Sequence, residues 1–306
     1  MKSAIITGAN GFIGSAVCKE LLKKDVHVYA IVRSQNAFQI PRCSKLHVVE
    51  ADLSSYDSLC TMIPHHIDVF YHFAWDGTYG KSLSDYRQQI KNIEYACKTL
   101  IVAEKLKCKK FIMAGTINEL ELFQFFHAEN SRPRPACIYG ISKLSCDLLC
   151  KTLAAEMNMF YNTAIIGSCF GPGDKSERIH NVFIKNMLLD TTPRLVEAEN
   201  LHDWVYIDEV ASMFYAIGEK SVNMKNYYIG HNSLRKLKDI LIDVRDILNP
   251  KKELVFGDIK DSFYIDYTLV DINALYQDTD YVDASDFEFN IMQTANWVKY
   301  FFLGCQ

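Results

Sequence analysis

The chain has 306 residues, of which 49% are hydrophobic, and a formal net charge of −4. This length and composition allow a full hydrophobic core, and the mildly acidic balance, with no basic run interleaved with aromatics, argues against nucleic acid as a partner. The apolar runs are too short for a signal peptide or a membrane span, so we expect a cytoplasmic protein with no membrane partner.

The cysteines predict neither a metal site nor a disulfide framework. The chain has ten of them, scattered along its length, and no two form a Cys-x-x-Cys pair. Zinc sites and disulfide-rich folds both need closer or more regular spacing. Reduced thiols in a cytosolic protein are the better interpretation.

The first half of the chain alternates short apolar runs with longer segments of helical period. This alternation predicts βαβ units that build a parallel sheet. The expected strands are Ser3–Thr7, His27–Val32, Lys45–Val49, Val69–Phe73, Lys110–Ala114 and Asn162–Ile166. The expected helices are Phe12–Lys24, Asp85–Lys105 and Ser142–Glu156.

The pattern changes after Gly171-Pro172-Gly173, where mixed helical and polar stretches follow. We therefore expect residues 1–168 to form a dinucleotide-binding domain, to which residues 202–230 return. Residues 169–201 and 231–306 would form a smaller substrate-binding domain. The expected fold class is α/β, a Rossmann-type doubly wound parallel sheet with a smaller C-terminal substrate domain.

Three glycines with Gly-x-x-Gly-x-x-Gly spacing follow the first strand and open the first helix. Gly8 permits a tight turn, Gly11 lets the backbone approach an anion, and Gly14 lets the helix pack closely on the strand. Glycines this close together also occur in purely structural loops, but the flanking strand and helix favour a pyrophosphate-binding loop. The expected cofactor contacts in this loop are Gly8, Asn10, Gly11, Phe12, Ile13 and Gly14.

Arg33 follows the second strand, at the position where an acidic residue would hold the 2′-hydroxyl of a cofactor ribose. A basic residue at this position favours a 2′-phosphate, and therefore NADP. In the alternative interpretation, Arg33 is an ordinary surface residue and the cofactor is NAD.

Tyr139 and Lys143 lie four residues apart, on one face of a predicted helix. A nearby ammonium group stabilises a phenolate, which would lower the pKa of Tyr139 and let it exchange a proton with an alcohol or a carbonyl. The pair alone is weak evidence, because the chain has 17 tyrosines. Its position after the fifth strand, which Gly115-Thr116 ends, predicts a catalytic set of Thr116, Tyr139 and Lys143, although Thr116 could also be an ordinary strand-terminating residue.

These features together resemble the extended short-chain dehydrogenase/reductase family, in particular its nucleotide-sugar epimerases, dehydratases and 4-ketoreductases. The resemblance runs over nearly the whole chain and includes Asn92, which in the family supports the active site. Two later segments, Phe170–Asp174 and His202–Ala211, are similar to the loop into the substrate domain and to a later signature of the family. Further implied cofactor contacts are Arg33, Asp52, Leu53, Phe73, Ala74, Lys143 and Ile166, and implied substrate contacts are Ser168, Asn181 and His202.

The chain departs from the family pattern at three places. Ile165 and Ser168 stand where the family usually has Arg and Asn, which shortens one polar contact to the substrate. His202 stands where the family usually has an Arg that binds the nucleotide diphosphate, so this contact is weakened or redirected. In the alternative interpretation His202 only caps a surface turn, and Arg178 and Arg235 are then the next candidates for binding the diphosphate. Thr116 is followed by Ile117-Asn118-Glu119 and not by the Asp-Glu pair of the dehydratases, which disfavours dehydration.

We therefore expect an NAD(P)-dependent enzyme that reduces a 4-keto-6-deoxy sugar nucleotide with Tyr139 as acid/base. A nucleotide-sugar 4-epimerase with tightly bound NAD would use the same residues. A non-catalytic NAD(P)-binding sensor and a reductase of flavonoid- or steroid-like ketones are further alternatives. The resemblance also implies a homodimer, formed through the helices around Asp85–Lys105 and Gly140–Glu156.

Overall fold

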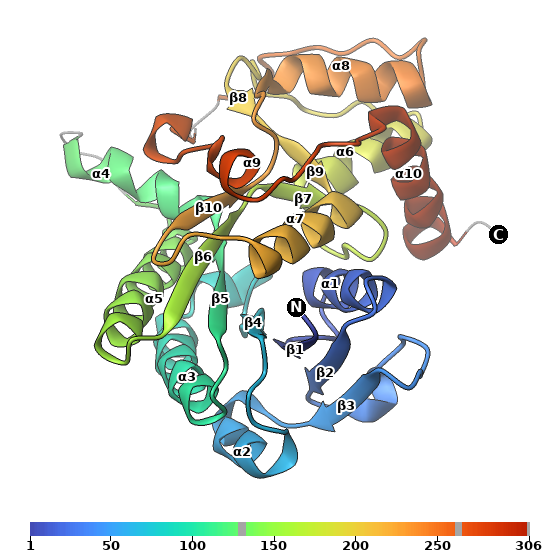
Figure 1. Cartoon of the computed structure of the whole chain (residues 1–306). Coiled ribbons are helices and arrows are strands. Elements are labelled where there is room, and N and C mark those ends of the chain that lie inside the picture. Colours follow the sequence, from blue (N-terminus) through green and yellow to red (C-terminus); the bar gives the residue numbers. More distant parts are fainter. Residues whose placement is uncertain (128–132, 261–264, 305–306) are drawn as a thin grey trace.

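A seven-stranded parallel sheet forms the centre of the molecule in the computed structural model, which describes residues 1–127, 133–260 and 265–304. The strand order is β10-β6-β5-β4-β1-β2-β3, and the order reverses between β1 and β4, as Figure 1 shows. This arrangement confirms the predicted Rossmann-type α/β fold. The strands are β1 (Ser3–Thr7), β2 (His27–Val32), β3 (Leu46–Glu50), β4 (Val69–His72), β5 (Lys110–Thr116), β6 (Phe160–Ile166) and β10 (Asn226–Ile229).

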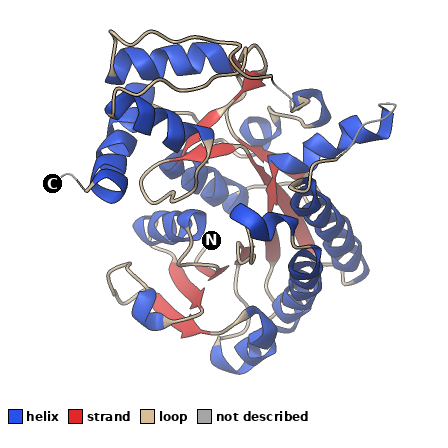
Figure 2. Ribbon diagram, turned by 180° about the vertical axis from the view of Figure 1, so that it is seen from behind, coloured by secondary structure: helices blue, strands red, loops and turns tan. Residues whose placement is uncertain are grey.

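Helices cover both faces of this sheet, which explains why its strands are nearly continuous apolar runs. On one face α1 (Phe12–Lys23) packs against α7 (Ile207–Glu219), and on the other α3 (Tyr86–Lys105) packs against α5 (Cys137–Glu156) (Figure 2). Each face has its own buried apolar cluster. None of the helices within the described residues combines the length and the apolar character that crossing a bilayer requires.

Shorter elements lie beyond the carboxyl ends of the sheet strands. A parallel pair joins β7 (Ser168–Phe170) to β9 (Trp204–Tyr206), and an antiparallel pair joins β8 (Leu201–His202) to β11 (Arg235–Lys236). Three helices, α6 (Ile179–Leu188), α8 (Leu237–Leu248) and α10 (Phe287–Leu303), pack against one another. The remaining helices are α2 (Leu59–Met62), α4 (Gln124–His127), α9 (Ala274–Asp278) and the 3-10 helices η1 (Gln35–Ala37), η2 (Leu53–Ser58), η3 (Gly80–Ser84), η4 (Ile117–Phe123) and η5 (Tyr267–Leu269).

For most of the predicted helices and strands of the first half, the first and last residues lie within two positions of the observed ones. The clear exception is α5, which begins at Cys137 and not at the expected Ser142. Gly140 has a low helix propensity, but tertiary packing overrides it, because a Cβ at this position would lie 2.6 Å from the carbonyl oxygen of Asn118. The close approach of α5 to η4 therefore requires glycine, and Tyr139 is placed inside the first turn of the helix.

Candidate active site

The carboxyl ends of the parallel strands bring together segments that are far apart in the sequence. Ligands of open α/β folds bind at this edge, at the point where the strand order reverses. Here β1 leads into the glycine loop, β4 leads into Phe73 and Ala74, and β5 ends at Thr116. Residues 171–173 approach the same region, because a Cβ on Gly173 would lie 3.4 Å from the ring of Phe12.

The glycine loop is a tight turn against the end of β4. Gly8 has φ +65°, and a Cβ there would lie 2.9 Å from the backbone nitrogen of Ala74. A Cβ on Gly14 would overlap the carbonyl oxygen of Gly8, so α1 can sit this close to the loop only with glycine at this position. The Gly11 N–H closes the turn by donating to the Gly8 carbonyl at 2.9 Å.

The start of α1 fits the pyrophosphate of a dinucleotide. Gly11 is the N-cap residue, no side chain within the described residues caps the helix, and its first turn contains no acidic residue. The first backbone N–H groups of a helix have no partner inside the helix and carry partial positive charge. Phe12 and Ile13 can therefore present these donors to an anion without competition from a carboxylate.

Thr7 and His72 connect the ends of β1 and β4. The Thr7 hydroxyl lies 2.9 Å from Nδ1 of His72 and accepts a hydrogen bond of 3.2 Å from the backbone N–H of Ala74. His72 is fully buried, and this burial lowers its pKa to about 3, so the ring is neutral. The network fixes the backbone of Phe73 and Ala74 opposite the glycine loop.

Arg33 and Asp52 lie at the ends of β2 and β3, where a cofactor ribose is expected. The Arg33 side chain is 75% exposed, and its Nη1 lies 3.4 Å from Oδ1 of Asp76. Asp52 caps η2, because its carboxylate accepts a hydrogen bond of 3.0 Å from the N–H of Ser54. The hydrogen bonds to Ser54 lower the pKa of this carboxyl, and the charge of Arg33 makes a smaller contribution in the same direction. Arg33 is therefore the residue at this end whose polar group reaches into solvent and can meet a phosphate.

Thr116, Tyr139 and Lys143 lie together at the boundary of β5 and α5, and all three side chains are largely buried. The Thr116 hydroxyl donates to Oδ1 of Asn118 at 3.1 Å and acts on the Tyr139 phenol, whose pKa it lowers. Lys143, one turn further along α5, donates to the carbonyl oxygen of Ala114 at 2.9 Å. The structure thus brings together the three residues that the sequence analysis assigned to catalysis.

Trp75 is a neighbour of this group that the sequence analysis did not identify. The Lys143 ammonium lies 3.8 Å from the centre of the Trp75 ring, in a cation–π contact, and the ring meets the Tyr139 ring edge-on at 6.3 Å. Burial lowers the pKa of Lys143, while Cys146 and Glu119 act in the opposite direction. Trp75 follows the Phe73-Ala74 segment directly, but no spacing rule connects an aromatic residue there to the later lysine.

The pKa of Tyr139 differs from our expectation. Burial raises it to about 12; the charge of Arg178 and the hydrogen bond from Thr116 lower it, and Glu119 raises it further. We had expected Lys143 to lower this pKa, but in the structure the ammonium faces Ala114 and Trp75 and does not contribute. In the protein without ligands, Tyr139 is therefore a neutral phenol, ready to donate a proton.

The two carboxylates that follow Thr116 are both engaged in structural contacts. Glu119 is buried, and its Oε1 accepts a hydrogen bond of 2.7 Å from the backbone N–H of Thr116. Glu121 lies 2.6 Å from Nη2 of Arg134 and accepts from the Cys137 thiol at 3.2 Å. Glu121 is thus the partner of an ion pair, whereas Glu119 is bonded to the backbone of Thr116 and burial raises its pKa to about 8.

The expected substrate-binding residues lie on the second group of elements. Ser168 and His202 are partly exposed, on β7 and β8, whereas the amide nitrogen of Asn181 on α6 donates to the Asp174 and Ser176 segment at 2.9 to 3.0 Å. Asn181 therefore holds a loop in place. Arg178 is exposed, and its charge acts on both Tyr139 and His180. Burial, followed by the charges of Arg178 and His202, lowers the pKa of His180.

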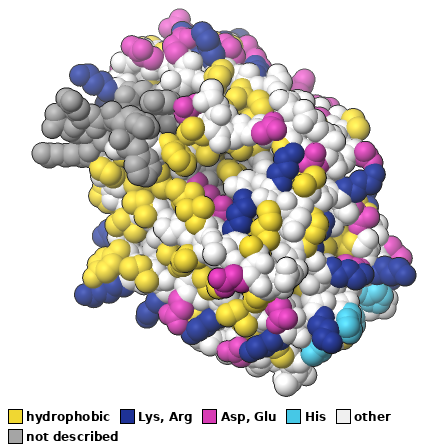
Figure 3. All heavy atoms as spheres, turned by 60° about the vertical axis from the view of Figure 1, so that its left-hand side comes forward, with side chains coloured by type: hydrophobic (Ala, Val, Ile, Leu, Met, Phe, Trp, Pro, Cys, Tyr) yellow, Lys and Arg dark blue, Asp and Glu magenta, His cyan; other side chains and the backbone are white. Residues whose placement is uncertain are grey.

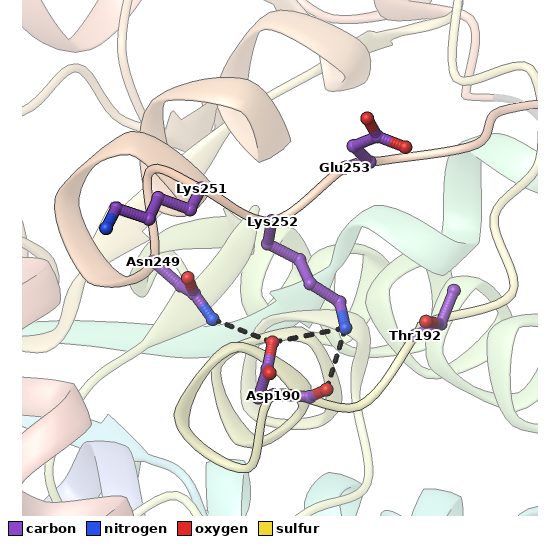
Figure 4. Close-up of a pocket in the computed structure, with 6 residues that line it drawn as sticks. All are labelled: Asp190, Thr192, Asn249, Lys251, Lys252 and Glu253. Carbon is purple, nitrogen blue, oxygen red and sulfur yellow. Dashed lines mark hydrogen bonds and ion pairs between the residues drawn. The ribbon is translucent and has the colours of Figure 1, made fainter.

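A polar depression of about 660 Å³ lies away from the catalytic residues (Figure 4). Asp190 accepts from the amide of Asn249 at 3.1 Å and lies 3.2 Å from Nζ of Lys252. Two of its charged residues thus form an ion pair with each other, and we assign the depression no role in the reaction. The lining residues are Asp190, Thr192, Asn249, Lys251, Lys252 and Glu253.

Comparison with known proteins agrees with this geometry. Residues 4–230 match the model of the NAD dependent epimerase/dehydratase family. The dTDP-glucose 4,6-dehydratase of Escherichia coli is 22% identical over 96% of this chain and 92% of its own length, and the dTDP-4-dehydro-6-deoxyglucose reductase of the same organism is 22% identical over 83% of this chain and 84% of its own. The crystal structure of UDP-glucuronic acid 4-epimerase from Bacillus cereus in complex with NAD has a TM-score of 0.75 and 22% identity over 100% of this chain and 99% of that one. The chain belongs to the NAD dependent epimerase/dehydratase family of the extended short-chain dehydrogenases/reductases, whose members act on nucleotide sugars.

Proposed function

We propose that the protein transfers a hydride at C4 of a nucleotide sugar, and that its main reaction is the reduction of a 4-keto-6-deoxy sugar nucleotide. The observation that carries this proposal is the set of Thr116, Tyr139 and Lys143, next to two carboxylates that are held in other contacts. A dehydratase would need one of these carboxylates at the substrate. Relatives at 22% identity include a dehydratase and a reductase, so the choice between these two reactions has to be argued from the residues of the site.

In this reaction Tyr139 holds the proton and delivers it from Oη to the oxygen of the sugar carbonyl. The Thr116 hydroxyl, beside the phenol, orients the carbonyl oxygen of the sugar that receives this proton. Lys143, one helical turn further along α5, serves as a contact to the cofactor. The glycine loop would hold the pyrophosphate of a reduced dinucleotide, which would supply the hydride when bound.

We infer NADP as the preferred cofactor, because Arg33 is the exposed basic group at the ribose end. The Arg33→Asp variant is expected to shift the ratio of the dissociation constants towards NAD, since the carboxylate repels a 2′-phosphate and accepts from a 2′-hydroxyl. Titrating the parent and the variant with NADPH and NADH measures this ratio. Arg42→Asp, which makes the same charge change at a nearby exposed arginine, should leave the ratio unchanged. A parent that already prefers NADH would contradict the inference.

A nucleotide-sugar 4-epimerase with tightly held NAD is the second candidate. It is favoured by the fold, which matches a 4-epimerase structure that holds NAD, and by the ion pair that already occupies Arg33. The protein should therefore be purified and any retained nucleotide identified by mass spectrometry. NADPH consumption with a 4-keto-6-deoxy sugar nucleotide supports the reductase, whereas retained NAD and redox-neutral interconversion of UDP-sugars support the epimerase.

We propose Arg178 as a residue that binds the nucleotide diphosphate. It precedes His180 by two residues, its charge acts on Tyr139, and it carries a permanent charge that His202 lacks. The Arg178→Gln variant should bind UDP and dTDP roughly tenfold to a hundredfold more weakly, because a charge-assisted hydrogen bond contributes about 1.5 to 3 kcal/mol. Isothermal titration calorimetry measures this, with Arg42→Gln as the control. Equal affinities for Arg178→Gln and the parent would remove Arg178 from the site.

We also propose a homodimer formed through α3 and α5. Large hydrophobic side chains on these two helices are exposed in the single chain, and Figure 3 turns this side of the molecule forward and shows hydrophobic side chains gathered on it. A contiguous apolar surface of this kind usually marks a protein interface. The exposed residues are Tyr86, Ile90 and Ile101 on α3 and Ile141, Leu148 and Leu149 on α5.

The Leu148→Lys variant is expected to be a monomer, because a charge placed at the centre of an apolar interface is costly to desolvate. Light scattering after size exclusion gives the molecular mass. Leu189→Lys is the control, since Leu189 is also exposed, at 48% against 57% for Leu148, but lies at the end of α6. If the parent itself has the mass of one chain, or the variant stays dimeric, this interface is wrong.

A further inference from the structure

A cluster of one imidazole and three carboxylates lies outside the proposed catalytic set. His231 follows β10, Asp203 lies between β8 and β9, Glu209 is in the first turn of α7, and Asp283 lies between α9 and α10. The cluster thus joins the segment 203–209 to His231 and to Asp283, which lie further along the chain. The proposed reaction assigns no role to His231, Glu209 or Asp283.

Asp203 holds the ring of His231 in one orientation. Its Oδ1 lies 2.6 Å from Nδ1 of His231, while its Oδ2 accepts from the backbone N–H of His231 at 2.8 Å and from the Tyr228 hydroxyl at 2.9 Å. The Asp203 side chain is only 3% exposed. Nε2 of His231 is therefore directed towards Glu209 and Asp283. A carboxylate on one ring nitrogen is the usual support of a histidine that binds a metal through the other nitrogen.

The three remaining donor atoms lie close enough together for one metal ion to contact them all. Nε2 of His231 lies 3.4 Å from Oε1 of Glu209 and 3.7 Å from Oδ2 of Asp283, and the three ligand atoms all lie within 4.8 Å of one another. Ligands about 2.0 to 2.2 Å from a tetrahedral zinc ion are separated by about 3.3 to 3.6 Å. The other oxygen of Glu209 accepts from the backbone N–H of Tyr206 at 2.9 Å, which orients Oε1 towards the cluster.

The charge of the cluster also favours a cation. Three carboxylates face a single imidazole, so the group carries excess negative charge even when the ring is protonated.

We propose that His231, Glu209 and Asp283 bind one divalent transition-metal ion of the zinc class, with Asp203 as the residue that positions His231. A ligand set of one nitrogen and two carboxylate oxygens suits this class of ion. The bound ion would connect the start of α7 and the end of β10 to the segment before α10. Its role is structural, and the proposal is independent of the proposed function.

The test uses the full chain, freed of metal with a chelator and titrated with ZnCl2 by calorimetry. One ion should bind per chain. His231→Gln and Asp283→Asn should abolish this binding, and Asp203→Asn should weaken it by roughly tenfold to a hundredfold, as loss of an outer carboxylate does. His65→Gln, which removes an exposed histidine elsewhere, should bind as the parent does. Circular dichroism confirms that each variant is folded, and the partly exposed Asp283 makes Asp283→Asn the variant least able to disturb the fold.

Titration with CoCl2 identifies the ligands through its absorption spectrum. Weak d–d bands without a thiolate charge-transfer band are expected for nitrogen and oxygen ligands. A thiolate band would show that the cysteines bind the metal and would overturn the proposal. So would the lack of saturable binding by the parent, or unchanged binding by the folded His231→Gln and Asp283→Asn variants.

Discussion

Replacing Tyr139 by Phe is expected to lower turnover by roughly a hundredfold to ten-thousandfold, which is the usual contribution of a positioned acid or base. The variant keeps the buried ring and its edge-on contact with Trp75, so the fold and cofactor binding should not change. Only the proton donor next to Thr116 is lost. Steady-state rates with the nucleotide-sugar substrate, together with cofactor titrations, measure both effects.

Tyr300→Phe serves as the control for this variant. Tyr300 is also a helical tyrosine, but it is 70% exposed and lies on α10, far along the chain from the catalytic residues. Removing the hydroxyl of Tyr300 should leave turnover unchanged. Turnover of Tyr139→Phe close to that of the parent would exclude Tyr139 as the acid.

The second large effect is expected for Gly14→Ala. The added methyl group would overlap the carbonyl of Gly8, a backbone atom that cannot move without opening the turn. We expect a loss of about 1 to 3 kcal/mol in the free energy of unfolding, which is typical of overpacking, and much weaker cofactor binding. Denaturant unfolding and cofactor titration test the two parts separately.

The neighbouring Ser15→Ala variant is the matched control, because it lies on the same turn of α1 and adds no atom. It removes only the hydrogen bond from the Ser15 hydroxyl to the Phe12 carbonyl, so its effect should be small. If Gly14→Ala binds the cofactor as tightly as Ser15→Ala, the loop does not need glycine at this position for the cofactor.

The parts of the fold that could be predicted are those with a strong local signal. The strands from Ser3–Thr7 onward are apolar runs between amphipathic helices, and the glycine loop stands directly between a strand and a helix. The start of α5 was missed because the need for Gly140 comes from the backbone of Asn118, a tertiary contact. The division into domains, the localisation and the individual site residues remain predictions.

The contacts of Lys143 and of His231 were beyond the reach of sequence patterns for the same reason. The spacing of Tyr139 and Lys143 shows that they share a helix face, but not that Trp75 and a strand carbonyl hold the ammonium. His231 and Asp283 are 52 residues apart, and neither belongs to a recognisable spacing. Only the packing of the segment before α10 against the end of β10 brings them together.

Helix α5 carries two kinds of residue on opposite sides. Tyr139 and Lys143 are buried on one side, whereas Ile141 and Leu148 are exposed on the other. The same helix therefore carries both the proton donor and the surface through which we propose that a second copy is bound. If a second copy binds there as proposed, the dimer interface and the proton donor lie only one helix diameter apart, roughly 10 Å.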